Sequence, residues 1–177
     1  MSLNNSRINL ILFSILLIFV KYYILMPSTY WKTVDNSWYL LYFNRLNDAY
    51  FYDIIKIQFS AIGAVEPLSA LFYYLVAKLL DVASIPAVTS SLYLILFIAC
   101  FKKITIYSYF IILLYFVGFY EFVLFDIAHR LKVSGILCLL VIYLCKHKIF
   151  QFLWIPLLAH VSTILIVLPL YMYAKLS

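Results

Sequence analysis

Residues 86–125 read PAVTSSLYLILFIACFKKITIYSYFIILLYFVGFYEFVLF, two long apolar runs interrupted only by the pair Lys102 and Lys103. About 20 mostly apolar residues are enough for a helix to cross the hydrocarbon core of a bilayer. Both runs come near this length, and lysines in a short connection favour the cytoplasmic side. The stretch therefore predicts two membrane helices joined by a short basic turn.

The composition of the whole chain supports this interpretation. Of 177 residues, 67% are hydrophobic and only 11% are charged, which leaves too few polar side chains to cover a water-soluble surface. The formal charge of +6 does not indicate nucleic acid as a partner, because the basic residues are scattered among aromatic ones. We expect an integral membrane protein of the all-α class.

Six apolar segments predict the membrane bundle. The strong ones are residues 8–26, 86–101, 104–125, 133–145 and 150–173. Residues 67–80 would form a helix of only about 21 Å, shorter than the roughly 30 Å hydrocarbon core, so we expect a half-helix or a re-entrant segment there. The chain contains no repeat or flexible linker, so residues 1–177 are expected to form one polytopic domain with about five to six membrane segments.

Residues 36–62 differ from the membrane segments, because aromatic and apolar residues alternate there with charged ones at roughly helical spacing. This pattern predicts an amphipathic interfacial helix on the outer surface. Two roles remain open for it. It either covers the bundle or acts as a lid over a lipid-linked substrate.

The distribution of charge favours one topology. If residues 67–80 cross fully, the basic turns at 102–103 and 146–148 lie outside, against the positive-inside rule. If that segment re-enters, both turns lie in the cytoplasm, and we favour this arrangement. The outer side then holds all the carboxylates and a group of basic residues: Asp35, Asp48, Asp53, Glu66, Asp81, Glu121, Asp126, His129, Arg130 and Lys132.

The three cysteines do not predict a metal site. Cys100, Cys138 and Cys145 lie in or beside apolar runs and lack the spacing of metal ligands. They are expected to pack in the bundle. No metal or cofactor is expected.

Three ionisable residues are candidates for chemistry, because charge within or beside an apolar segment is costly to bury. Glu66 precedes Pro67, where it either caps a helix or places a carboxylate at the mouth of a pocket. Arg130 either grips a phosphate group through its planar guanidinium or pairs with Asp126 one turn earlier. His160 is either a hydrogen-bonded core residue, or a donor to phosphate or a group for proton transfer.

The order of these features resembles the EpsG-like group of bacterial exopolysaccharide and O-antigen polymerases, the Wzy-like membrane glycosyltransferases. The likeness covers most of the chain and corresponds to the N-terminal half of such a polymerase or to a short member. It departs from the family pattern at Leu68, Ser69 and Ser134. The matching parts are an outer loop with Asp48 and Asp53, the turn Glu66–Pro67, the aromatic run YFVGFYEF leading to Arg130, the KHK turn, and LLAHVSTILIVLPLY with His160.

The resemblance implies polymerisation of undecaprenyl-diphosphate-linked oligosaccharide repeat units at the outer face of the bacterial cytoplasmic membrane. Arg130, together with His160, would hold the departing diphosphate, and Glu66 or an outer-loop Asp would take the proton from the attacking sugar hydroxyl. The expected partners are the lipid-linked glycan, membrane lipids, and a chain-length regulator or other polysaccharide-assembly membrane proteins. A transporter or flippase for lipid-linked sugars, and a small accessory protein that modulates a full-length polymerase, remain the alternatives.

Overall fold

A computed structural model describes residues 5–25, 34–100, 105–117, 129–145, 149–152 and 154–160, and every regular element in these ranges is a helix. The all-α class is therefore confirmed for the described residues. The elements are α1 (Asn5–Phe19), the π-helix η1 (Val20–Leu25), α2 (Val34–Asp48), η3 (Phe51–Asp53), α3 (Ile54–Ile62), α4 (Pro67–Leu79), η4 (Val82–Ser84), α5 (Ile85–Ala99), α6 (Ile106–Val117), α8 (His129–Cys145), α9 (Ile149–Phe152) and α10 (Trp154–Leu157).

Two helical stretches are long and apolar enough to cross a membrane, Asn5–Tyr23 and Val82–Ala99. A third candidate is the pair Phe51–Ile62 and Pro67–Leu79, which is bent by 103° and forms either a broken span or a re-entrant loop. Membrane association is thus supported by length and composition. The expected count of five to six membrane segments is not confirmed by the described residues.

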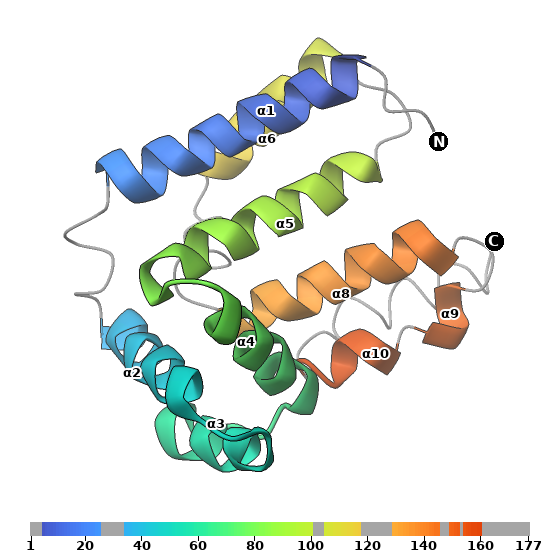
Figure 1. Ribbon diagram of the computed structural model, residues 1–177. Helices are drawn as coiled ribbons and strands as arrows, with labels where there is room; N and C mark the ends of the chain where they lie inside the picture. The colour runs from blue at the N-terminus through green and yellow to red at the C-terminus, as the bar shows by residue number, and fades with distance from the viewer. Residues whose placement is uncertain are drawn as a thin grey trace.

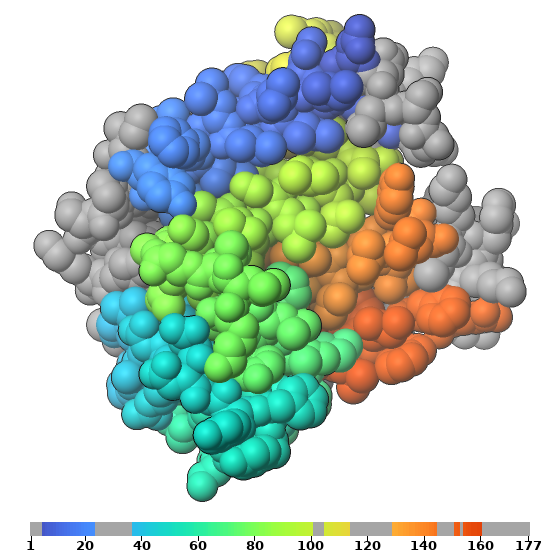
Figure 2. Space-filling view, in the orientation of Figure 1, coloured from blue at the N-terminus to red at the C-terminus, as the bar shows by residue number. Residues whose placement is uncertain are grey.

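The helical bundle is built on α5, which packs against α1 on one side and against α8 on the other. Figure 1 shows the three helices running side by side, with α6 against α1, and in Figure 2 they form adjoining bands coloured blue, green and orange. Gly135 allows α8 to approach α5 closely, because a Cβ atom there would lie 2.7 Å from Cε2 of Tyr93. A larger residue at this position would require the Tyr93 ring to shift.

The group of α2, α3 and α4 lies at the end of the bundle where η1 ends and α5 begins (Figure 1). Its core is rich in aromatic rings, and Tyr42, Phe43 and Tyr73 are fully buried there. Two local features turn the chain sharply between α3 and α4. Gly63 ends α3 in the left-handed conformation (φ 66°), and Pro67 occupies the start of α4.

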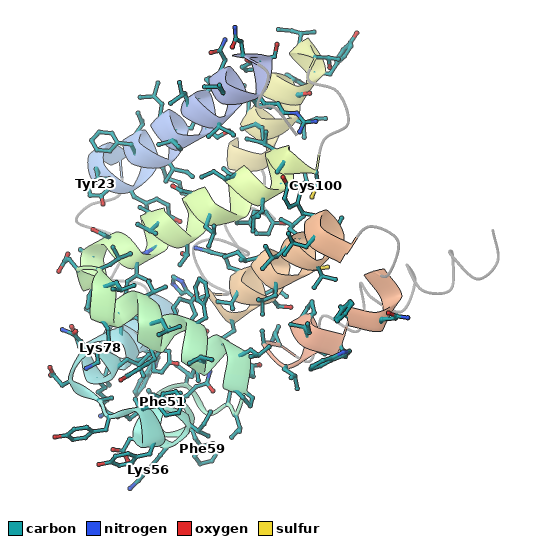
Figure 3. All side chains as sticks on the ribbon, turned by 45° about the vertical axis from the view of Figure 1, so that its right-hand side comes forward. Tyr23, Phe51, Lys56, Phe59, Lys78 and Cys100 are labelled. Atoms are coloured by element: carbon teal, nitrogen blue, oxygen red, sulfur yellow. The ribbon has the colours of Figure 1, made fainter. Side chains whose placement is uncertain are left out.

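The single interfacial helix expected over residues 36–62 is wrong, because the chain forms two helices there. It leaves α2 after Asp48, takes an extended conformation at Tyr50 (φ −86°, ψ 155°), and resumes in η3 and α3. Both α2 and α3 pack against α4, and one straight helix is unable to present both buried faces to the same neighbour. Figure 3 shows Phe51, Lys56 and Phe59 projecting from the outer side of this group.

The other expected segments agree with the helices to different extents. Residues 67–80 correspond to α4 except for residue 80, and residues 86–99 of the expected segment 86–101 lie in α5, whereas residue 101 lies outside the described residues. The helix expected over 133–145 begins earlier, at His129. Of the segments 8–26, 104–125 and 150–173, the parts 26, 104, 118–125, 153 and 161–173 lie outside the described residues; the described start of the last segment contains two short helices, α9 and α10.

Tyr73 provides a test of the packing between α4 and α8. Its buried hydroxyl donates a hydrogen bond of 2.8 Å to the backbone carbonyl of His129. The change Tyr73→Phe removes only this donor, so we expect the free energy of unfolding in detergent micelles to fall by about 1 kcal/mol. Tyr52→Phe is the matched control, since the Tyr52 side chain is exposed. Equal stability of Tyr73→Phe and the unmodified protein would contradict this account.

Candidate functional site

Glu66 lies immediately before α4 and is almost completely buried. Its side chain makes no capping hydrogen bond to the helix, so the capping role considered for this residue is not adopted. Its backbone N–H donates to Oε1 of Gln58 at 2.9 Å. The residue is therefore held at the turn between α3 and α4.

Arg130 lies in the first turn of α8 and contacts this carboxylate. Its Nη1 atom is 3.3 Å from Oε1 of Glu66, and the two side chains are 27% and 11% exposed. On another edge of the guanidinium, Nε donates to the Tyr39 hydroxyl at 3.2 Å. Asp126, the alternative partner, lies outside the described residues. The ion pair with Glu66 links α8 to the start of α4.

His160 follows α10 and completes the group. Its Nδ1 atom lies 2.6 Å from the same Oε1 atom of Glu66, although the residues are 94 positions apart in the chain. The backbone explains this placement, because the N–H of Leu68 donates to the carbonyl of Leu158 at 3.3 Å. Ala159 is fully buried in the core. The turn after α10 is thereby fixed against the start of α4.

The structure thus brings Glu66, Arg130 and His160 together at a single carboxylate oxygen. A buried carboxylate needs such partners, since an isolated ionised group is strongly disfavoured in a low-dielectric interior. When Nδ1 of His160 carries a proton, it donates to Glu66 and the second ring nitrogen, Nε2, faces away from the carboxylate. The group combines a carboxylate, a guanidinium and an imidazole, which together are suited to anion binding and proton transfer.

Two further residues, Gln58 and Ser69, orient the Glu66 carboxylate. Nε2 of Gln58 donates to Oγ of Ser69 at 2.7 Å, and Oγ of Ser69 lies 3.4 Å from Oε2 of Glu66. Both residues are fully buried. Sequence reasoning missed their role, because an isolated Gln and an isolated Ser carry no distinctive local pattern.

Aromatic side chains pack around His129, the residue that precedes Arg130 in the chain. The buried ring of His129 packs against Tyr39, with ring centroids 4.4 Å apart, and against Phe43 and Tyr73. Burial raises the pKa of the Tyr39 phenol and also that of Tyr42. Both phenols therefore remain neutral near physiological pH.

Lys132, which the charge distribution assigned to the outer side, lies inside the helical packing. Its side chain is buried, and Nζ donates to Oγ of Ser90 on α5 at 3.0 Å. The Tyr22 hydroxyl lies 3.2 Å from the same oxygen. This network joins α8, α5 and η1 and is separate from the contacts of Glu66. Glu121 and Asp126, which were also assigned to the outer side, lie outside the described residues.

Two cysteine side chains, Cys100 and Cys138, can be described. Cys100 and Cys138 have free thiols, and the Cys100 thiol lies 3.9 Å from the carbonyl of Leu139 across the contact between α5 and α8. In Figure 3, Cys100 lies at the opposite end of the molecule from Phe51 and Phe59. Among the described residues, no group of three His, Cys, Asp or Glu side chains is arranged to hold a metal ion.

No family model, curated protein or solved structure matches this chain.

Gln58 offers a test of how the site is held in place. The change Gln58→Leu keeps the approximate volume but leaves the buried N–H of Glu66 without its acceptor. We expect the free energy of unfolding to fall by about 1–3 kcal/mol, measured by SDS-induced unfolding from detergent micelles. The same change at Gln151, which is exposed on α9, should have little effect. A loss of equal size at both positions would argue against a specific role for Gln58.

Proposed function

We propose that this chain is a membrane glycosyltransferase that joins lipid-diphosphate-linked oligosaccharide repeat units into a surface or exopolysaccharide without a metal. The observation that carries the proposal is the meeting of Arg130 and His160 on Oε1 of Glu66, at 3.3 Å and 2.6 Å. These are the three residues to which the resemblance to Wzy-like polymerases assigns the chemistry. The three residues are far apart in the chain, and their meeting is what the proposed chemistry requires.

The position of the site in the fold also supports the proposal. Arg130 lies in the first turn of α8, a helix that packs against the candidate membrane helix α5, and Glu66 lies at the sharp turn between α3 and α4. A substrate with a polyprenyl tail needs a polar site beside the hydrocarbon region. Irregular backbone at this depth is tolerated where it is buried in protein or lines a polar cavity. We place the site at the outer face of the bacterial cytoplasmic membrane.

In the proposed reaction, a sugar hydroxyl of the incoming repeat unit attacks the anomeric carbon of the lipid-linked chain. The bond between that carbon and the diphosphate oxygen breaks, and its electron pair remains on the diphosphate. Arg130 stabilises the negative charge that grows on this leaving group, with His160 assisting, and such stabilisation is usually the largest catalytic contribution. Glu66 accepts the proton of the attacking hydroxyl.

Glu66 and the diphosphate compete for the same guanidinium. A diphosphate carries more negative charge than a carboxylate and binds Arg in a bidentate manner. Substrate binding would therefore draw Arg130 toward the diphosphate and release Oε1 of Glu66 to act as a base. Because His160 contacts the same oxygen, it restrains the carboxylate during this exchange.

A flippase for lipid-linked sugars is the second candidate, and the 103° bend between α3 and α4 is the observation that favours it. Discontinuous helices with charged residues at the break are common in transporter binding sites. The two functions differ in their products. A transporter moves the lipid-linked unit across the bilayer unchanged, whereas a polymerase forms new glycosidic bonds in detergent, where no membrane separates two compartments.

Arg130→Ala is the direct test of the polymerase. We expect purified protein in detergent to convert lipid-linked repeat units into longer chains and the variant to do so at least about 100-fold more slowly. Arg130→Lys should restore little activity, because an ammonium group cannot form the bidentate contact. Arg45→Ala, an exposed arginine on α2, is the matched control. Polymer of normal length and amount from Arg130→Ala, with normal insertion of the protein, would refute the proposed role.

A further inference from the structure

The hydroxyl group of Tyr42 has no hydrogen-bond partner among the residues that the structure describes, although the residue is fully buried. A buried hydroxyl without a partner costs about 1–3 kcal/mol, and such groups are uncommon in folded proteins. A phenylalanine would fill the same space in the aromatic core without this cost. The hydroxyl is thus a donor that a ligand of the site could use.

Tyr42 and Tyr39 lie three residues apart on α2, so their side chains share one face of the helix, and their ring centroids are 6.4 Å apart. Tyr39 in turn contacts Arg130, so the Tyr42 ring lies one side chain away from the guanidinium. The face of α2 that contacts Arg130 thus carries two phenol groups.

Tyr39 accepts a hydrogen bond from Nε of Arg130 at 3.2 Å. A phenol that accepts through its oxygen keeps its own hydrogen for donation to a second group. Of the five N–H groups of a guanidinium, the contacts with Tyr39 and Glu66 involve two. Phenol and guanidinium together therefore present donors, which match a ligand rich in acceptor oxygens.

We propose that the hydroxyls of Tyr39 and Tyr42, together with Arg130, form a binding subsite for a phosphate oxygen of the ligand. In its choice of a lipid diphosphate as that ligand, the inference rests on the proposed function. The subsite itself requires only an oxyanion that accepts hydrogen bonds from two neutral phenols and one guanidinium. Glu66 has two further contacts besides Arg130, to His160 at 2.6 Å and to Ser69 at 3.4 Å.

The test uses purified full-length protein in detergent, with inorganic diphosphate and farnesyl diphosphate as probes and farnesol as the probe without phosphate. Affinity is measured by isothermal titration calorimetry, and stability is measured by thermal unfolding without a probe. We expect Tyr42→Phe to weaken diphosphate binding about tenfold while leaving the melting temperature unchanged or higher. Tyr39→Phe should weaken binding at least as much.

Tyr73→Phe is the control that separates binding from stability, because the Tyr73 hydroxyl has a backbone acceptor and should affect stability alone. Binding of both inorganic diphosphate and farnesyl diphosphate assigns the subsite to the diphosphate group. Binding of farnesyl diphosphate without binding of inorganic diphosphate assigns it to the lipid-linked form. Unchanged affinity in Tyr42→Phe, or binding of neither probe by the unmodified protein, would overturn the inference. If the two diphosphate probes bind and Tyr42→Phe weakens their binding, but the purified protein forms no polymer, the subsite stands and the glycosyltransferase proposal fails.

Discussion

The carboxylate of Glu66 is the constraint on which the arrangement of this end of the molecule depends. A buried carboxylate is tolerated only when other groups compensate its charge and donate to its lone pairs. If one partner is lost, the desolvation cost of the buried charge is no longer offset. Three elements supply that compensation: α8 through Arg130, the turn after α10 through His160, and the first turn of α4 through Ser69. Segments far apart in the sequence are thus held together by the requirements of one side chain.

The backbone around Glu66 is built to meet those requirements. Gly63 ends α3 in the left-handed backbone conformation, which is unfavourable for residues with a Cβ atom. Pro67 fixes the start of α4, so the residues between Gly63 and Pro67 turn sharply. The hydrogen bond from Leu68 to Leu158 uses an N–H of the first turn of α4, which has no partner within its own helix. The same turn that bends the chain therefore also anchors the segment that carries His160.

The sequence permits prediction of those parts of the structure that depend on composition and on rare residues. Apolar runs predict helices because any lipid-exposed backbone must satisfy its hydrogen bonds internally, and charged residues stand out against that background. Glu66, Arg130 and His160 were recognisable for this reason. Tyr39 and Tyr42 were not, since the chain contains 17 tyrosines and only the packing of α2 on α4 and α8 distinguishes these two from the others. Likewise, the break between α2 and α3 and the burial of Lys132 arise from tertiary contacts that no local pattern encodes.

The combination of one guanidinium with neutral phenols has a physical advantage in a site that must exist with and without an anionic ligand. A second buried cation would require its own carboxylate whenever the ligand departs, whereas a phenol that loses its partner costs only about 1–3 kcal/mol. Arg130 is paired with Glu66 in the structure, so its charge is compensated without a ligand, and the hydroxyl of Tyr42 carries the smaller cost. Burial raises the pKa of both Tyr39 and Tyr42, so these phenols keep their hydrogens and remain donors at neutral pH. Such a site holds an oxyanion through directed neutral dipoles and a single exchangeable ion pair, and Arg130 regains Glu66 as its partner when the charged ligand leaves.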